Sequence, residues 1–231
     1  MGERVDRERA AGRGGVEAVV FDLDGVLVDS EQLWDAARRE LAGESGGRWH
    51  ERATRDMMGM SSPEWSRYMH EELGVPLPPE EISRAVVERL LALYEERLPL
   101  LPGAREAVER LAGRWPLGLA SSSNRPVIDR VLELSGLGRH FRATVSSEEV
   151  RRGKPAPDVY LEAARRLGAE PGRCAAVEDS TSGILAAKRA GMRVISIPNR
   201  AFPPEEEALR AADAVVPSLK KLLPETVAGE R

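Results

Sequence analysis

Short apolar runs alternate with amphipathic stretches along most of the chain. Runs rich in β-branched and small apolar residues that stop at glycine or polar residues are typical of buried strands. Five such runs are VEAVVFDLDGVLVD (16–29), WPLGLASSS (115–123), RATVSS (142–147), RCAAVED (173–179) and RVISIP (193–198), and DAVVPS (213–218) is a shorter candidate. Helical patterns occur beside them at 105–112, 126–134, 158–167 and 181–190. This order predicts an α/β fold with a Rossmann-like parallel sheet covered by helices on both faces.

Residues 31–100 break the alternation, because they contain amphipathic helical patterns and no convincing strand. We therefore predict a helical segment inserted between residues 16–30 and residues 101–225, which together form the α/β core. Three of the four tryptophans fall in this segment and are expected to pack in a small second core: Trp34, Trp49 and Trp65.

Composition narrows the class of protein. The 231 residues are 42% hydrophobic and 31% charged, with a net charge of −4 from mixed acidic and basic side chains, which argues against a nucleic-acid partner. Apolar runs are too short for a membrane span. Residues 1–15 are charged and glycine-rich, so we expect a disordered tail without the apolar core of a secretory signal. The single cysteine, Cys174, cannot form an internal disulfide, and we expect a cytoplasmic protein.

Polar residues gather where the predicted strands end. Ligands of parallel α/β sheets bind at the carboxyl ends of the strands. The four segments found there contain Asp22 and Asp24, then Ser121-Ser122-Ser123-Asn124, then Gly153-Lys154-Pro155, then Glu178-Asp179-Ser180. The carboxylates would repel one another without a cation, and Mg²⁺ prefers such oxygen ligands. Lys154 and the Ser121 hydroxyl would then donate to phosphate oxygens.

Each of these segments alone also has an ordinary structural explanation. An Asp-x-Asp pair is common in turns, and Ser121 to Asn124 or Glu178 to Ser180 could cap the helices that follow. A lysine between glycine and proline is usually a solvated loop residue. Four independent coincidences of this kind, in this order after strands, are improbable, which favours a catalytic site.

The same segments carry a family resemblance. DLDGVLVDS (22–30), LASSS (119–123), GKPAPD (153–158) and VEDSTSGILAAKRAG (177–191) resemble the four signatures of the haloacid dehalogenase superfamily, in its β-phosphoglucomutase-like phosphatase branch. The resemblance covers residues 16 to about 200. It implies that Asp22 is the nucleophile that forms an aspartyl-phosphate and that Asp24 is the general acid and base.

The resemblance also implies the remaining roles at the site. Mg²⁺ would be bound by Asp22, the Asp24 backbone carbonyl and Asp179, with Glu178 either a ligand or just behind the ligands. Ser121 and Lys154 would bind the phosphoryl group that is transferred. Residues 31–100 would be the family's cap, with hinges at 29–33 and 98–102.

Candidate substrate-binding residues lie on both parts of the chain. Residues 57–62 resemble the cap loop that touches substrate, although methionine at this spacing is also typical of packing. The substrate-binding candidates are Gly59, Ser61, Ser122, Ser123 and Asn124. Arg125 is either a contact for a distal anionic group or a solvated residue at a helix start.

Within this family the residues favour hydrolysis of a phosphate monoester of a small metabolite, such as a sugar or polyol phosphate. Asp24 argues against halide chemistry, and the absence of lysine from residues 31–100 argues against phosphonate cleavage through a Schiff base. The sugar mutases that this chain resembles have a histidine at the position of Trp34 and a basic residue at the position of Ser62. A sugar phosphomutase and a non-catalytic phosphometabolite-binding protein remain the alternatives. We expect a monomer or a weak homodimer.

Overall fold

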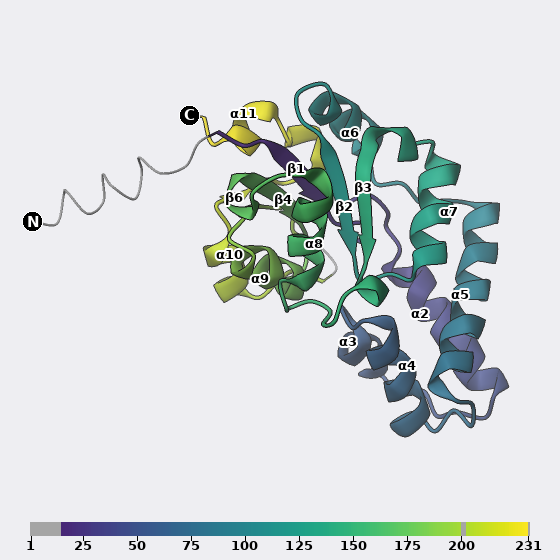
Figure 1. Ribbon diagram of the computed structural model, residues 1–231. Coiled ribbons are helices and arrows are strands. Elements are labelled where there is room, and N and C mark those ends of the chain that lie inside the picture. The colour runs from purple at the N-terminus through teal and green to yellow at the C-terminus, as the bar shows by residue number, and fades with distance from the viewer. Residues whose placement is uncertain (1–14, 200–201, 231) are drawn as a thin grey trace, which may run out of the picture.

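The centre of the molecule is a six-stranded parallel sheet in the order β3-β2-β1-β4-β5-β6, seen in a computed structural model that describes residues 15–199 and 202–230 (Figure 1). The strands are β1 (Ala18–Phe21), β2 (Leu117–Ser121), β3 (Phe141–Ser146), β4 (Cys174–Glu178), β5 (Arg193–Ser196) and β6 (Ala214–Val215). The prediction of a parallel α/β sheet is confirmed, including the short last strand. The expected tail lies outside the described residues except for Gly15.

The central strand, β1, determines which residues of the neighbouring strands lie beside its carboxyl end. Phe21, the last residue of β1, is paired with Leu119 of β2 on one side and with Val177 of β4 on the other. The backbone amide of Asp22 then donates to the Val177 carbonyl at 3.0 Å. Because the strands are parallel, the residues that follow each of them emerge at the same edge of the sheet.

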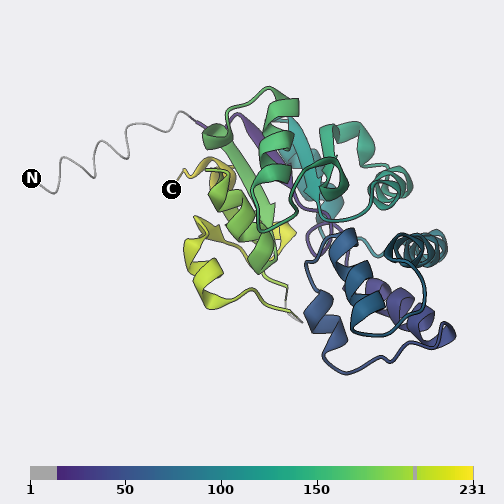
Figure 2. The same cartoon turned by 60° about the horizontal axis from the view of Figure 1, so that its bottom comes forward.

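Helices cover both faces of the sheet (Figures 1 and 2). The helices of the core are α6 (Ala104–Ala112), α7 (Arg125–Ser135), α8 (Asp158–Leu167), α9 (Thr181–Arg189), α10 (Glu206–Ala211) and α11 (Pro224–Ala228). Alternate residues of β1 point to opposite faces, so Val19 and Phe21 join one hydrophobic cluster while Ala18 and Val20 join the other. The four predicted core helices are confirmed to within one or two residues at either end.

Four helices occupy the chain between β1 and α6: α2 (Glu31–Glu44), α3 (Ala53–Met57), α4 (Ser62–Glu71) and α5 (Pro79–Glu96). They lie together beyond the carboxyl ends of β1 and β2 (Figure 2). The expectation of a separate second core is wrong, because Trp34 and Trp65 belong to the same hydrophobic cluster as Phe21, with Trp49 packed against it. The two parts are joined because α5 packs on α7 of the core as well as on α2 and α4.

The chain enters and leaves this helical segment through adjacent residues. Val28 and Leu100 form an antiparallel bridge. On either side of it, the Asp29 amide donates to the Pro99 carbonyl at 2.9 Å and the Leu101 amide donates to the Leu27 carbonyl at 2.9 Å. The two stretches predicted as hinges therefore lie side by side. In the described part of the chain, no helix has the length and apolar character needed to span a membrane.

Candidate active site

Asp22 and Lys154 form a buried ion pair where β1 ends. Asp22 directly follows β1, and Lys154 reaches it from the loop between β3 and α8. Lys154 Nζ donates to Asp22 Oδ1 at 2.7 Å and to Glu178 Oε1 at 2.6 Å. All three side chains are buried. Burial alone would lower the pKa of Lys154, but the two carboxylates raise it above its ordinary value, so the ammonium group is charged.

Glu178 is surrounded by hydrogen-bond donors. Its Oε1 accepts from Lys154 and, at 2.7 Å, from the hydroxyl of Tyr160 on α8. Its Oε2 accepts from the amides of Asp179 and Ser180, at 3.0 and 3.2 Å, and from the Ser180 hydroxyl at 3.1 Å. Burial raises the pKa of Glu178, but Lys154 and the other donors outweigh it and hold the pKa below its ordinary value. This carboxylate is ionised and both of its oxygens are occupied.

Asp179 completes a group of three buried carboxylates. One carboxylate oxygen from each of Asp22, Glu178 and Asp179 lies within 4.8 Å of the others. Among the described residues, no donor hydrogen-bonds to the Asp179 carboxylate, in contrast to Glu178. Gly25 has φ +78°, and a Cβ there would lie 1.9 Å from Asp179 Oδ2. Glycine is therefore required for the backbone to approach this carboxylate.

The electrostatics of the group fit a divalent cation. When ionised, Asp22, Glu178 and Asp179 carry three negative charges against the one positive charge of Lys154. Burial, with Glu178 and Asp24 nearby, raises the pKa of Asp22 to about 8 despite Lys154. Burial and the neighbouring carboxylates also raise the pKa of Asp179 well above its ordinary value. Two further positive charges would keep both groups ionised at neutral pH, and the ligands are the oxygens that Mg²⁺ prefers.

Asp24 lies beside this group and is held by side chains from both parts of the molecule. Its Oδ1 accepts from Ser30 Oγ at 2.5 Å and from Trp34 Nε1 at 3.1 Å. Its Oδ2 accepts from Ser123 Oγ at 2.6 Å and from Ser121 Oγ at 3.3 Å. A tryptophan N–H can only donate, whereas a serine hydroxyl can also accept. A proton on Asp24 would therefore face one of the three serines and not Trp34.

The serines after β2 have separate surroundings. Ser122 lines the cavity that contains Asp22 and Lys154. Ser123 contributes its hydroxyl to Asp24. The Ser121 hydroxyl, besides its contact with Asp24, accepts from the Ser123 amide at 3.0 Å.

Asn124 connects the core to the inserted helices. Its Oδ1 accepts from Ser62 Oγ at 2.6 Å, at the start of α4. Its amide nitrogen donates to Glu148 Oε1 at 2.7 Å and to Ser83 Oγ at 3.3 Å. The buried Asn124 side chain thus holds α4 and α5 against the core, and it is not among the residues that line the cavity with Asp22.

The two predicted cap residues also differ from each other. Gly59 lines the cavity with Asp22, and with φ +73° it approaches α9 so closely that a Cβ would lie 2.9 Å from Ser182 Oγ. Ser61 precedes α4, and its hydroxyl donates to Glu64 Oε2 at 2.5 Å. Ser61 lines a neighbouring cavity of about 780 Å³ that also touches Lys154. Ser61 therefore caps the N-terminus of α4 in this structure.

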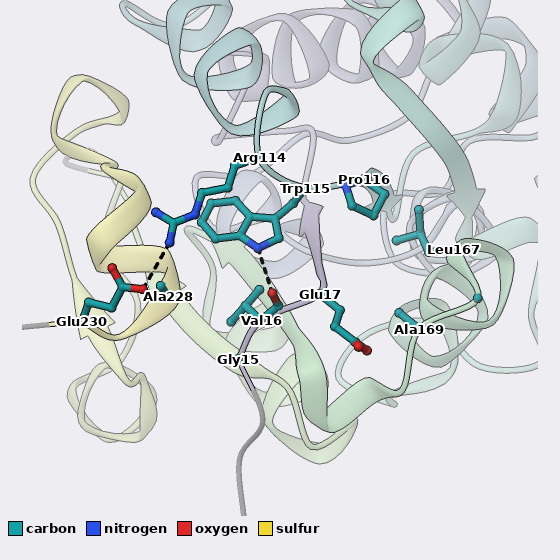
Figure 3. Close-up of a pocket in the computed structure, with 11 residues that line it drawn as sticks. Gly15, Val16, Glu17, Arg114, Trp115, Pro116, Leu167, Ala169, Ala228 and Glu230 are labelled. Carbon is teal, nitrogen blue, oxygen red and sulfur yellow. Dashed lines mark hydrogen bonds and ion pairs between the residues drawn. The ribbon is translucent and has the colours of Figure 1, made fainter.

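Two small adjoining cavities mark where a ligand fits. The first, of about 60 Å³, is lined by Asp22, Lys154, Asp179 and residues around them. The second, of about 50 Å³, lies under the inserted helices. Asp24 lines both. A separate cavity of about 540 Å³ lies where β1 and β2 begin, beside Val16 and Trp115 (Figure 3), and it contains none of the candidate residues.

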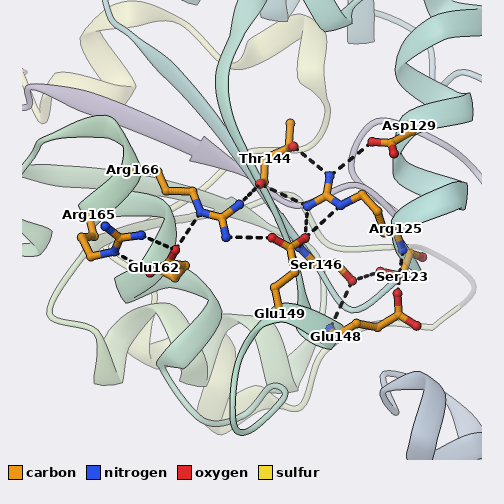
Figure 4. A network of polar contacts seen from close by, with 10 residues as sticks. All are labelled: Ser123, Arg125, Asp129, Thr144, Ser146, Glu148, Glu149, Glu162, Arg165 and Arg166. Atoms are coloured by element: carbon orange, nitrogen blue, oxygen red, sulfur yellow. Dashed lines mark hydrogen bonds and ion pairs between the residues drawn. The ribbon is translucent and has the colours of Figure 1, made fainter.

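Arg125 makes contacts that remove it from the site. It belongs to a network in which Glu149 binds both Arg125 and Arg166, with Asp129 and Thr144 also in contact with Arg125 (Figure 4). The network connects the start of α7 to the C-terminal half of α8 across the end of β3. Arg125 is therefore a structural residue at a helix start.

Three contacts at the site were missed by sequence reasoning. Ser30 ends the first motif and Trp34 follows it closely, and their spacing from Asp24 gave no sign that both reach its carboxylate. Tyr160 lies within α8 among apolar residues, so its sequence position resembles that of a core residue. Only the packing of α8 on the sheet brings its hydroxyl to Glu178.

The fold and the site together define an α/β enzyme with a buried carboxylate and lysine centre. The chain belongs to the haloacid dehalogenase-like hydrolases, because the sequence model of that family matches residues 16–191. The predicted membership of this family is confirmed.

Curated relatives agree with this assignment. The chain is 39% identical to hexitol phosphatase B of Escherichia coli (strain K12) over 187 residues, which cover 78% of this chain and 83% of that protein. It is 36% identical to the phosphorylated carbohydrates phosphatase of Thermotoga maritima, covering 78% of this chain and 84% of that protein. These relatives confirm the prediction of a phosphoric monoester hydrolase.

Solved structures agree as well. The crystal structure of CbbY from Rhodobacter sphaeroides in complex with phosphate has a TM-score of 0.81 and 30% identity, covering 90% of this chain and 96% of that one. A structure described as a β-phosphoglucomutase from Thermotoga maritima has a TM-score of 0.70 and 33% identity, covering 90% of this chain and 97% of that one.

Proposed function

We propose that the protein hydrolyses phosphate monoesters of sugars or polyols through an aspartyl-phosphate formed on Asp22. The observation that carries the proposal is the buried contact between Asp22 and Lys154 beside an acidic group that fits Mg²⁺. The names of the relatives, a hexitol phosphatase and a phosphorylated carbohydrates phosphatase, support the substrate class.

In the first half of the reaction, a carboxylate oxygen of Asp22 attacks phosphorus. The bond between phosphorus and the oxygen of the leaving alcohol breaks, and a proton on the Asp24 carboxyl group passes to that oxygen. Lys154 stays in contact with Asp22 and neutralises negative charge near the phosphoryl group. Ser121 and Ser122 are the donors from the end of β2 that we assign to phosphoryl oxygens.

In the second half, a water molecule attacks phosphorus of the aspartyl-phosphate. Asp24, now ionised, accepts a proton from that water, and the phosphorus–Asp22 bond breaks to release inorganic phosphate. The four donors around Asp24 hold it in one orientation for both proton transfers. Asp24 is thereby returned to its protonated form for the next cycle.

We assign Mg²⁺ to the side chains of Asp22 and Asp179 and to the Asp24 backbone carbonyl. When bound, Mg²⁺ supplies charge compensation and polarises a phosphoryl oxygen. Glu178 is assigned behind these ligands, because Lys154, Tyr160 and the backbone of the following turn already occupy both of its oxygens. Its role is to fix Lys154 and the turn that carries Asp179.

We further propose that residues 31–100 form a cap that closes over the site and excludes water. The paired stretches near Val28 and Leu100 would be its hinge. The contact between Ser62 and Asn124 would form on closure. Cytoplasmic location and a monomeric or weakly dimeric state remain predictions, which fractionation and size-exclusion chromatography test.

The experiment is a screen for phosphate release from sugar and polyol phosphates with and without Mg²⁺. Turnover that requires Mg²⁺ supports the proposal. Borohydride reduces an aspartyl-phosphate to homoserine, so mass spectrometry of protein quenched during turnover should find homoserine at position 22. Conversion of a sugar 1-phosphate to its 6-phosphate instead of phosphate release would indicate the mutase alternative. Binding without either reaction would indicate the non-catalytic one.

A further inference from the structure

Arg38 is a buried cation in the inserted helices that has no ion-pair partner among the residues that the structure describes. The residue is only 7% exposed. Its guanidinium carbon lies 4.9 Å from the ring centre of Trp34 and 5.0 Å from that of Trp65. Its Nε has no hydrogen-bond partner within residues 15–199 and 202–230. In the parts of the chain that the structure describes, no carboxylate lies within 4.0 Å of the guanidinium.

This arrangement is costly unless a ligand completes it. Removing a charged group from water costs several kcal/mol, and contact with aromatic rings returns only a part of this. Glu31, Asp24 and Asp35 act on Arg38 from beyond ion-pair distance, and burial lowers its pKa to about 10. By comparison, the neighbouring Arg39 is exposed and bound to Asp35 at 3.3 Å.

Arg38 also faces the part of the site where the leaving alcohol belongs. It lines the cavity of about 50 Å³ together with Asp24, Glu31, Trp34 and Trp65. Lys154 and Asp179 line the other cavity, and Asp24 belongs to both. If Asp24 gives its proton to the leaving oxygen, the phosphoryl group lies on the Lys154 side. The rest of the substrate then extends past Trp34 towards Arg38.

The size of this cavity and the positive charge of Arg38 indicate which group Arg38 receives. The cavity is small, at about 50 Å³. A planar carboxylate of three heavy atoms suits it better than a tetrahedral phosphate of five. A carboxylate can accept two parallel hydrogen bonds from a guanidinium and neutralises its charge, which a hydroxyl group cannot do.

We propose that Arg38 binds a carboxylate at the far end of the leaving group, so that the enzyme favours phosphates of sugar acids over phosphates of the matching polyols. This inference rests on the proposed phosphatase function. It adds a specificity-determining residue and a charge requirement to it.

The test compares two pairs of compounds that differ only in a terminal carboxylate or CH₂OH group. The pairs are 3-phosphoglycerate with glycerol 3-phosphate and 6-phosphogluconate with sorbitol 6-phosphate. We expect the wild type to favour the acid of at least one pair by about 10- to 100-fold in kcat/KM, the range for a hydrogen-bonded charge pair. Arg38→Gln should abolish this preference. Arg38→Lys should keep only part of it, since lysine lacks the planar fork.

Arg39→Gln is the matched control, because it removes one arginine from the same helix at an exposed position and should retain the wild-type ratio. Because the readout is a ratio between two substrates, a general loss of activity in a variant does not change it. Equal use of both members of each pair by the wild type, or preference for the polyols, would overturn the proposal. So would a preference that survives Arg38→Gln.

Binding measurements separate this inference from the proposed function. Calorimetry on Asp22→Asn protein, with and without Arg38→Gln, gives the Kd ratio for each pair without turnover. If the wild type hydrolyses none of the four compounds, the Kd ratio still decides the role of Arg38. If Arg38→Gln does not fold, as judged by circular dichroism, the wild-type ratio and Arg38→Lys decide it.

Discussion

The end of the sheet and the inserted helices contribute to the site in different ways. At the sheet end, Lys154 and Glu178 are buried and each polar atom has its partner inside the core. In the inserted helices, Trp34 reaches Asp24 while Arg38, one turn further along α2, has no ion-pair partner among the described residues. The side chains proposed to carry the reaction at the sheet end are therefore held in place by the protein itself. The helices hold groups whose partners a substrate can supply.

The largest expected effect follows from replacing the proposed nucleophile. Asp22→Asn should lower kcat for phosphate release by about 10⁴-fold or more, because an amide cannot form the covalent intermediate. The fold should survive, since asparagine keeps the shape of the side chain. Phosphate release measures the loss of activity, and the far-ultraviolet circular dichroism spectrum measures whether the fold is kept. Activity within tenfold of the wild type would refute the assigned role.

The acidic group also predicts how stability depends on pH without metal. The pKa of Asp22 is raised to about 8 in the folded protein from an ordinary value of 3.8. Between these values the folded state holds a proton that the unfolded chain has released, so stability falls as pH rises. The raised pKa of Asp179 acts in the same direction. The pKa of Glu178 is lowered and that of Lys154 is raised. Both shifts affect stability mainly outside the pH range between 3.8 and about 8.

We therefore expect the Tm of protein treated with a chelator to fall by roughly 5–10 °C between pH 5 and pH 8. Saturating Mg²⁺ should remove most of this fall, because it stabilises the ionised carboxylates. Asp22→Asn should show a smaller fall than the wild type in the chelator. Scanning calorimetry at several pH values measures all three, and a Tm that rises over this range would contradict the assignment.

A moderate effect is expected where the inserted helices touch the reaction centre. Trp34→Phe keeps an aromatic ring beside Trp65 but removes the hydrogen bond to Asp24 Oδ1. Loss of one such bond corresponds to a decrease in kcat of roughly 3- to 10-fold. Stopped-time phosphate assays at saturating substrate measure it. An unchanged kcat would show that the sheet end orients Asp24 without help.

The smallest effect is expected away from both regions. Arg125→Gln removes contacts with Glu149, Asp129 and Thr144 in the surface network of Figure 4. Partly exposed ion pairs contribute little, so the free energy of unfolding should drop by about 0.5–1 kcal/mol in urea titrations. The kcat/KM should equal that of the wild type. A large loss of activity would return Arg125 to the list of substrate contacts.

The sequence allowed the sheet and most of the reaction centre to be predicted because both depend on local order along the chain. A residue that directly follows a parallel strand must emerge at the carboxyl edge of the sheet, and this placed Asp22 and Asp179 together. The segment with Lys154 was placed at the same edge because it follows β3 in the chain, although a loop separates the two. Strand and helix boundaries followed from apolar runs and glycine stops.

The remaining contacts depend on packing between distant segments, which the sequence does not express locally. Nothing in α8 indicated that the Tyr160 hydroxyl reaches Glu178. The inserted tryptophans were expected in their own core, yet α5 packs on α7 and joins them to the core of the sheet. Asn124 was predicted to bind substrate, whereas its side chain holds Ser62 and Glu148.

The bridge between Val28 and Leu100 has a consequence for the history and engineering of such proteins. Since the chain departs from and returns to the sheet layer through one hydrogen-bonded pair, the sheet accommodates the whole insertion as it would a hairpin. A segment of different length or sequence could be spliced between those two points without altering the pairing of β1 with β2. Catalytic chemistry and substrate choice can then diverge independently, by exchange of a module whose two ends already meet.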